Sequence, residues 1–99
     1  MIARHWRALA RAEEAQRYVE HLRKDTFPAL EKIAGFVDAS ILHRTVRGGV
    51  EFVIVTRWAS LEAIETFAGS DPERAVVPPK VIAMMVEYDG RVKHFDVLD

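Results

Sequence analysis

The chain has 99 residues, of which 49% are hydrophobic and 29% charged, and it contains no cysteine. Its formal net charge is −1, which disfavours a basic nucleic-acid or membrane surface, so we expect neither partner. The missing cysteine excludes disulfides, thiol nucleophiles and thiolate metal sites. No apolar run is long enough to cross a membrane, and we expect one cytoplasmic domain spanning residues 1–99.

The N-terminal part predicts a strand followed by a helix. Ile2–Leu9 alternates in hydrophobicity, which indicates a strand. Apolar side chains then recur with helical spacing and give one buried stripe: Ala15, Tyr18, Val19 and Leu22. Because proline has no backbone N–H, Pro28 predicts a break near Asp25–Phe27 and a short turn that ends at Gly35.

A hairpin follows, with strands at Phe36–Val46 and Val50–Trp58 joined by Arg47-Gly48-Gly49. Alternate side chains point to opposite sides of a strand, and both sides of the second strand are apolar. Val53 and Val55 lie on one side, and Phe52, Ile54 and Trp58 lie on the other. Because one short chain cannot cover both faces of its sheet, we predict a homodimer packed sheet to sheet.

The C-terminal part predicts a capped helix, turns and a last strand. Ser60 is a suitable N-cap for a helix over Leu61–Ala68, which Gly69 ends. Leu61, Ile64 and Phe67 are expected to line its buried side, while Glu62 and Glu65 face water. Further turns begin at Asp71-Pro72 and at Pro78-Pro79, the second extending to Met85; after a turn at Tyr88–Arg91, the last strand is Val92–Leu98.

The predicted order is therefore strand, helix, strand, strand, helix, strand. This is the split β-α-β order of a ferredoxin-like α+β fold, in which an antiparallel sheet carries its helices on one face. Two such sheets packed by their bare faces would form a dimeric α/β barrel.

The segment Trp58-Ala59-Ser60-Leu61-Glu62-Ala63-Ile64-Glu65-Thr66-Phe67 resembles the Trp-x-Ser-x-Glu-Ala-x-x-x-Phe signature of the antibiotic biosynthesis monooxygenase domain, in the dimeric α/β-barrel superfamily. Ser70-Asp71, the start Met1–Arg7 and the close Val92–Val97 are also similar to small bacterial members. The resemblance implies a small dimer with a pocket between helices and sheet in each subunit. Relatives include oxygenases that oxidise phenolic metabolites with dioxygen and no metal or flavin, quinol-directed oxygenases, and a haem-degrading branch.

The haem-degrading branch uses an asparagine on the first strand, a tryptophan in the helix after the third strand and a histidine further on. Under this resemblance, these positions fall near Trp6, Phe67 and Val77, so none of the three side chains is present. We therefore expect haem degradation to be disfavoured.

Three side chains are candidate catalytic residues. His94 on the last strand is a candidate base, since imidazole titrates near physiological pH. Arg4 and Arg44 lie on strands with apolar neighbours, where a guanidinium stabilises a phenolate or enolate. The alternatives are a strand histidine bonded to a neighbour, and arginines paired across the sheet with carboxylates, for which the candidates are Glu51, Asp38 and Asp96.

Four aromatic side chains are candidate substrate contacts. Trp6 shares a strand face with Arg4, and this pair is the preferred pocket floor. Trp58 is a second wall, with core packing as its alternative. Tyr18 is expected to face the sheet, where its hydroxyl either reaches the cavity or lies at the core edge in water, and Phe67 completes the group.

No metal or cofactor site is expected. We find no histidine paired at i, i+4 with a carboxylate of metal-site type, and we place His21 on the polar side of its helix. The predicted function is a cofactor-independent monooxygenase that oxidises a small aromatic, polyphenolic or quinone-like metabolite with dioxygen. The alternative is a non-catalytic ligand-binding or stress-response protein of the same fold.

Overall fold

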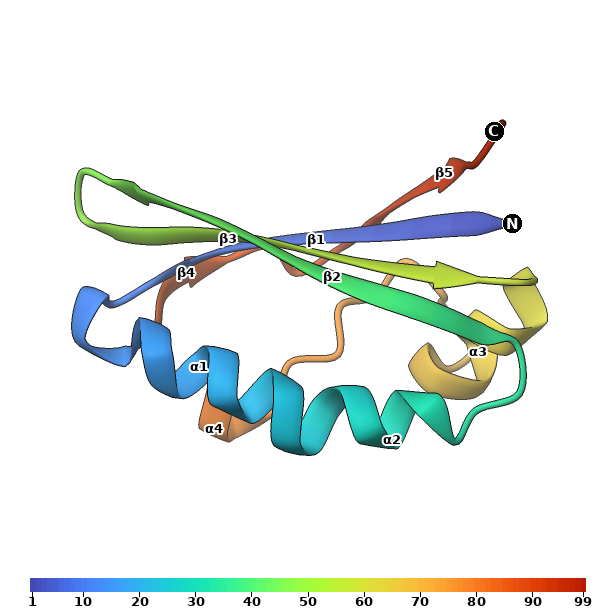
Figure 1. Ribbon diagram of the computed structural model, residues 1–99, viewed down its shortest axis with the longest axis horizontal. Helices are drawn as coiled ribbons and strands as arrows, with labels where there is room; N and C mark the ends of the chain where they lie inside the picture. The colour runs from blue at the N-terminus through green and yellow to red at the C-terminus, as the bar shows by residue number, and fades with distance from the viewer.

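One antiparallel sheet carries every helix on the same face, as the computed structural model of residues 1–99 shows (Figure 1). The strands are β1 (Ile2–Ala10), β2 (Phe36–Val46), β3 (Gly49–Trp58), β4 (Met85–Tyr88) and β5 (Lys93–Asp96). Their order is β2-β3-β1-β4, and β5 also pairs with β1. The predicted ferredoxin-like α+β class is therefore confirmed.

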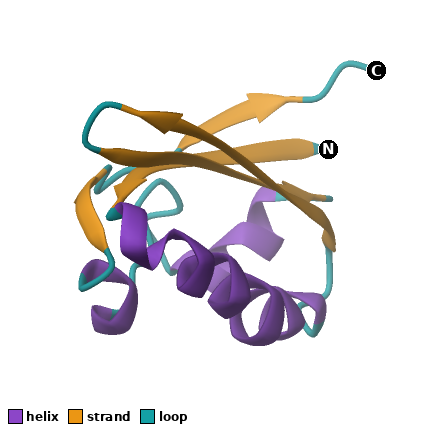
Figure 2. Ribbon diagram, turned by 60° about the vertical axis from the view of Figure 1, so that its left-hand side comes forward, coloured by secondary structure: helices purple, strands orange, loops and turns teal.

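The long hairpin β2–β3 places alternate side chains on the two faces, as predicted. Phe52, Ile54 and Trp58 are buried on the side that carries the helices. Val53 and Val55 are only half-buried, on the open side. Figure 2 shows that no element of the chain covers this open side.

The helical segment after β1 continues through Pro28. It consists of a 3-10 turn (Ala12–Glu14), α1 (Ala15–His21), a π-helical turn (Leu22–Thr26) and α2 (Phe27–Glu31). The predicted break near Asp25–Phe27 is wrong, because the amide of Phe27 donates to the carbonyl of Leu22, five residues back. This wider turn relieves the clash between a proline ring and the carbonyl four residues before it.

The π-helical turn also decides which side chains face the sheet. Tyr18, Leu22 and Leu30 are all buried. In a regular α-helix, Leu30 would lie about 120° round the helix axis from Tyr18. The wider turn takes up an additional residue and rotates Leu30 back towards the sheet.

The C-terminal part differs from the prediction. The helix that begins at Pro79 is short, α4 (Pro79–Ile82), and Met85 starts strand β4. The predicted last strand Val92–Leu98 is the shorter β5. β4 pairs with Ala8–Ala10 and β5 with Ile2–His5, so two short strands share the edge of β1 that β3 leaves free.

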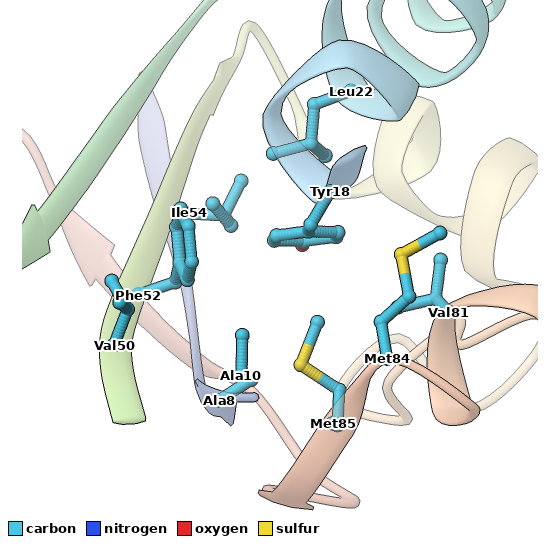
Figure 3. Close-up of a cluster of buried hydrophobic side chains, with 10 residues drawn as sticks. All are labelled: Ala8, Ala10, Tyr18, Leu22, Val50, Phe52, Ile54, Val81, Met84 and Met85. Carbon is cyan, nitrogen blue, oxygen red and sulfur yellow. The ribbon is translucent and has the colours of Figure 1, made fainter. Parts of the chain in front are cut away.

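Two apolar clusters fill the space between sheet and helices. Figure 3 shows the larger one, in which Tyr18 lies between α1 and the sheet. The smaller cluster contains Leu30, Trp58, Ala63 and Ile64. Trp58 and Ile64 are fully buried, which makes them the anchors of the smaller cluster. None of the helices has the length and apolar composition needed to cross a bilayer.

Helix α3 (Leu61–Ala68) begins at the predicted cap, where the Ser60 hydroxyl accepts a hydrogen bond from the amide of Ala63 at 3.2 Å. Ile64 is buried and Glu62 and Glu65 are exposed, as predicted, but Leu61 is 41% exposed. Helical side chains lean towards the N-terminus, so at the first position of α3 the Leu61 side chain extends past the end of the helix. Gly35 allows the close approach of α3, because its φ is +93° and a Cβ atom there would lie 2.6 Å from that of Ala63.

Candidate active site

A cavity of about 320 Å³ lies between the sheet and the helices, and it is lined mostly by apolar side chains. Four of the predicted site residues line it: Arg4, Trp6, Tyr18 and Phe67. The strand β1 supplies the first two, α1 the third and α3 the fourth. Its volume is at the lower end of the roughly 300–1,000 Å³ that is usual for small-molecule sites.

Arg4 is held by neutral groups only. Its Nη1 donates to the carbonyl of Pro72 and lies 3.0 Å from Nε2 of His94, and its Nη2 donates to the carbonyl of Arg74 at 2.8 Å. The guanidinium also lies over the ring of Phe67, 5.7 Å from the centroid. These contacts fix its position on the sheet wall of the cavity.

The charge of Arg4 has no carboxylate partner, although the residue is only 5% exposed. The salt bridges of the chain do not include it. Burial lowers the pKa of Arg4 to about 10, so the guanidinium is still protonated at neutral pH. A buried cation without an anion is unfavourable, and this one borders a cavity large enough for a small ligand.

His94 supports Arg4 and does not line the cavity. Because a guanidinium can only donate, Nε2 of His94 must accept, and the ring proton of neutral His94 is on Nδ1. Burial, and secondly the charge of Arg4, lower the pKa of His94. Its accepting nitrogen is thus already occupied, and we assign His94 a positioning role in place of the predicted role of base.

The stability of the protein is expected to depend on pH through His94. Because the pKa of His94 is below its ordinary 6.5 in the folded chain, the unfolded chain binds the proton more readily. The contribution is complete above about pH 6.5 and decreases as the pH falls below that value. Urea unfolding at about pH 7.5 and about pH 5.5 should show a smaller loss on acidification in His94→Gln, whose amide oxygen can still accept from Arg4. An equal loss in the two proteins would contradict this.

The aromatic candidates separate into cavity walls and core. Trp6 is half-buried and donates from Nε1 to the carbonyl of Asp89 at 2.7 Å. Trp58 is fully buried, donates to the hydroxyl of Thr56 at 2.9 Å and stacks on Phe67 with centroids 5.9 Å apart. It therefore supports the wall that Phe67 forms and does not line the cavity itself.

The Tyr18 side chain is almost completely buried, at 2% exposure, and packs edge-on against Phe52 with centroids 5.0 Å apart. Its hydroxyl has no hydrogen-bond partner in the protein, yet no buried side-chain oxygen or nitrogen lacks one. The hydroxyl is therefore open to the cavity that Tyr18 lines. Burial raises the pKa of Tyr18, which keeps the hydroxyl protonated as a donor.

Arg44 lies outside this site. Its side chain is 73% exposed on the open face of the sheet, where Nε pairs with Oε1 of Glu51 at 2.6 Å. Arg7 binds the other oxygen of Glu51 at 2.7 Å. The hydrogen bond from Arg44, followed by that from Arg7, lowers the pKa of Glu51. The sequence suggested two arginines for one site, but the alternation along β2 turns Arg44 to the other face.

His21 and Asp25, which were not among the predicted site residues, also line the cavity. Nδ1 of His21 lies 3.1 Å from Oδ2 of Asp25, and the His21 side chain is only 11% exposed. The placement of His21 on the polar side of its helix was wrong, and Asp25 is its carboxylate partner at i, i+4. That spacing was the available signal. The pair has no third ligand, and no cluster of three or more His, Cys, Asp or Glu side chains that could hold a metal ion is present.

Three solved structures with similar folds give the chain a context. A candidate antibiotic biosynthesis monooxygenase from Bacillus cereus has 24% identity and a TM-score of 0.64, over 99% of this chain and 91% of the other. A variant of MhuD with two manganese protoporphyrin IX molecules per active site has 23% identity and a TM-score of 0.62, over 100% and 97%. The haem degrader MhuD from Mycobacterium tuberculosis, with two haems bound, has 22% identity and a TM-score of 0.61, over 100% and 98%.

These similarities show the fold alone, and a search of the curated proteins found no significant match. Because two of the similar structures are of a haem degrader, the expectation that haem degradation is disfavoured is not supported. The sequence model of the family described as antibiotic biosynthesis monooxygenase matches residues 1–78. Because this match covers more than half of the 99 residues, the chain belongs to the antibiotic biosynthesis monooxygenase family.

Proposed function

We propose that the cavity binds a small phenol as its phenolate and that the protein oxidises this ligand with dioxygen without a cofactor. The observation that carries the proposal is the buried charge of Arg4, which has only neutral partners at the edge of an apolar cavity. An aromatic anion matches both features, since its ring fits the apolar walls and its oxygen supplies the missing negative charge.

The substrate carries most of the chemistry in this proposal. The phenol first loses its hydroxyl proton to a base. A ring carbon that carries a hydrogen atom then forms a covalent bond to one oxygen of O2. The O–O bond then breaks, and water leaves as this carbon becomes a carbonyl. For 1-naphthol the products are 1,4-naphthoquinone and one water, so O2 is fully reduced by the substrate. The protein supplies position, charge stabilisation and a dry site.

Binding of 1-naphthol under nitrogen tests the role of Arg4. The absorbance of naphtholate at longer wavelength reports the bound anion, and 1-methoxynaphthalene is a control ligand of similar shape that cannot ionise. We expect Arg4→Met to weaken naphtholate binding by about 10- to 100-fold, the value of a charge-assisted contact. Arg44→Met, on the other face of the sheet, should bind normally. Equal binding by Arg4→Met, or equally tight binding of the methyl ether, would overturn the proposal.

Adding air to the anaerobic complex distinguishes an enzyme from a non-catalytic binding protein. We expect one O2 to be consumed for each naphthoquinone formed, faster than in buffer alone. Binding without O2 uptake would favour the non-catalytic alternative. Haem titration tests a third possibility, that the cavity binds haem. If haem displaces naphtholate and a Soret band appears on binding, haem is identified as the ligand.

We also propose that the chain forms a homodimer through the open face of its sheet. Half-buried Val53 and Val55 lie at the middle of this face, and Leu42, which is 53% exposed, is directly opposite Val53 on β2. Phe95, which is 49% exposed, lies on the other side of β1, opposite Ala3. The ion pairs of Glu51 lie towards the hairpin end of the same face. An apolar centre with a charged margin is the usual composition of a protein interface.

A further inference from the structure

The helix wall of the cavity carries a pair of side chains that the proposed function has not used. His21 is the last residue of α1, and Asp25 lies in the π-helical turn that follows. Both line the cavity, whereas Arg4 belongs to its sheet wall. Lys80 of α4 lies near the pair, with Nζ 3.8 Å from Oδ2 of Asp25.

The pair leaves one nitrogen of His21 available. An ionised carboxylate can only accept hydrogen bonds. The 3.1 Å contact between Nδ1 of His21 and Oδ2 of Asp25 is therefore a hydrogen bond when Nδ1 carries the ring proton. Nε2 then has a lone pair and has no partner within the protein. Because no buried side-chain nitrogen is left without a partner, Nε2 is open to the cavity or to solvent.

The other groups near the ligand site are poorly suited to accept a proton. Arg4 is a cation, and Nε2 of His94 already accepts from Arg4. Burial raises the pKa of Tyr18, so its hydroxyl is a donor at neutral pH. Asp25 is half-exposed and shares its Oδ2 with His21 and Lys80. His21 alone combines an open lone pair with a carboxylate that stabilises the imidazolium.

We infer that His21, oriented by Asp25, is the base that takes the hydroxyl proton of the phenol in this cavity. This inference rests on the proposed function. The O–H bond breaks, its electron pair stays on the phenolate oxygen, and the proton moves to Nε2 of His21. After the ring carbon has bonded to O2, the imidazolium returns this proton to the peroxide oxygen, so His21 is regenerated before water leaves.

Proton release during anaerobic binding of 1-naphthol tests the inference. At a pH where free 1-naphthol is neutral, a proton that moves to His21 stays in the complex. The wild type should therefore release almost no proton to a weakly buffered indicator for each naphtholate bound. His21→Gln should release about one proton for each naphtholate bound, and its Kd should change less than about tenfold because Arg4 remains. His43→Gln is the matched control, since His43 stacks on Phe52 with centroids 5.5 Å apart and does not line the cavity.

The outcomes distinguish this inference from the proposed function. Release of about one proton by the wild type, with naphtholate bound, would overturn the role of His21 and leave the proposed function intact. Absence of the naphtholate band in the wild type would overturn both. If His43→Gln released as many protons for each naphtholate bound as His21→Gln, the effect would come from removing any imidazole. That result would also overturn the assignment.

Steady-state oxidation of 1-naphthol gives a second measurement. We expect His21→Gln to lower kcat by about 100-fold with little change in KM, as for loss of a general base. Asp25→Asn should lower kcat less and leave KM unchanged, which a purely structural role of Asp25 would not produce. An unchanged kcat in His21→Gln would overturn the assignment.

Discussion

Val55→Asp is expected to convert the proposed dimer into monomers. Val55 lies on the open face of the sheet, where its neighbours across the strands are His5 and Ser40. In a two-fold dimer each substitution occurs twice, so two like charges would be removed from water in one interface. The cost is at least about 3 kcal/mol, which weakens association more than a hundredfold. Sedimentation velocity at micromolar concentration measures this change.

Leu61→Asp is the matched control for the dimer. Leu61 is also exposed and apolar, but it lies in the first turn of α3, on the helix side of the molecule. A carboxylate is favourable in that turn, so both the fold and the dimer should persist. A wild-type monomer at micromolar concentration, or a dimer that persists in Val55→Asp, would refute assembly through this face.

Trp58→Ala is expected to lower the free energy of unfolding by about 3–5 kcal/mol. Trp58 is fully buried, stacks on Phe67 and packs edge-on against Phe36, with ring centroids 5.2 Å apart. Alanine would leave a large cavity in the smaller core cluster, where α3 meets the sheet. For a domain of this size the loss is a large fraction of the typical total of about 5–15 kcal/mol, and urea unfolding measures it.

Two other substitutions show whether this loss comes from core packing. Trp58→Phe keeps most of the ring and loses the hydrogen bond to Thr56, so we expect a loss of about 1–2 kcal/mol. Trp6→Ala enlarges a cavity that already exists, and its stability should fall less than that of Trp58→Ala. A loss below about 1 kcal/mol in Trp58→Ala would contradict the role of Trp58 as a core anchor.

The parts of the fold that the sequence predicts correctly have local causes. The two faces of β3 follow from simple alternation, and the start of α3 follows from one hydroxyl at Ser60. The short strand β4 has no local cause, because Met85 joins the sheet through Ala10, far away in the sequence. The apolar run that contains Met85 is equally suited to a helix, and only the free edge of β1 determines the outcome.

Site residues were predictable where alternation along a strand determines the face of the sheet on which a side chain lies. Arg4 and Trp6 share a face of β1, and both line the cavity. Arg44 was misplaced because the face of β2 that meets the helices is set by its register with β3. His21 was missed because the apolar stripe of a helix only separates buried positions from solvent-facing ones. A polar residue that lines a cavity belongs to neither group.

The π-helical turn has a consequence for the comparison of related chains. A relative with one residue fewer between Tyr18 and Leu30 could form a regular α-helix there, and its later helical positions would turn by about 100° relative to these. An ungapped alignment would then pair residues that lie on different sides of the helix. In this family, the length of the segment between Tyr18 and Leu30 therefore determines which side chains reach the cavity, as much as their identities do.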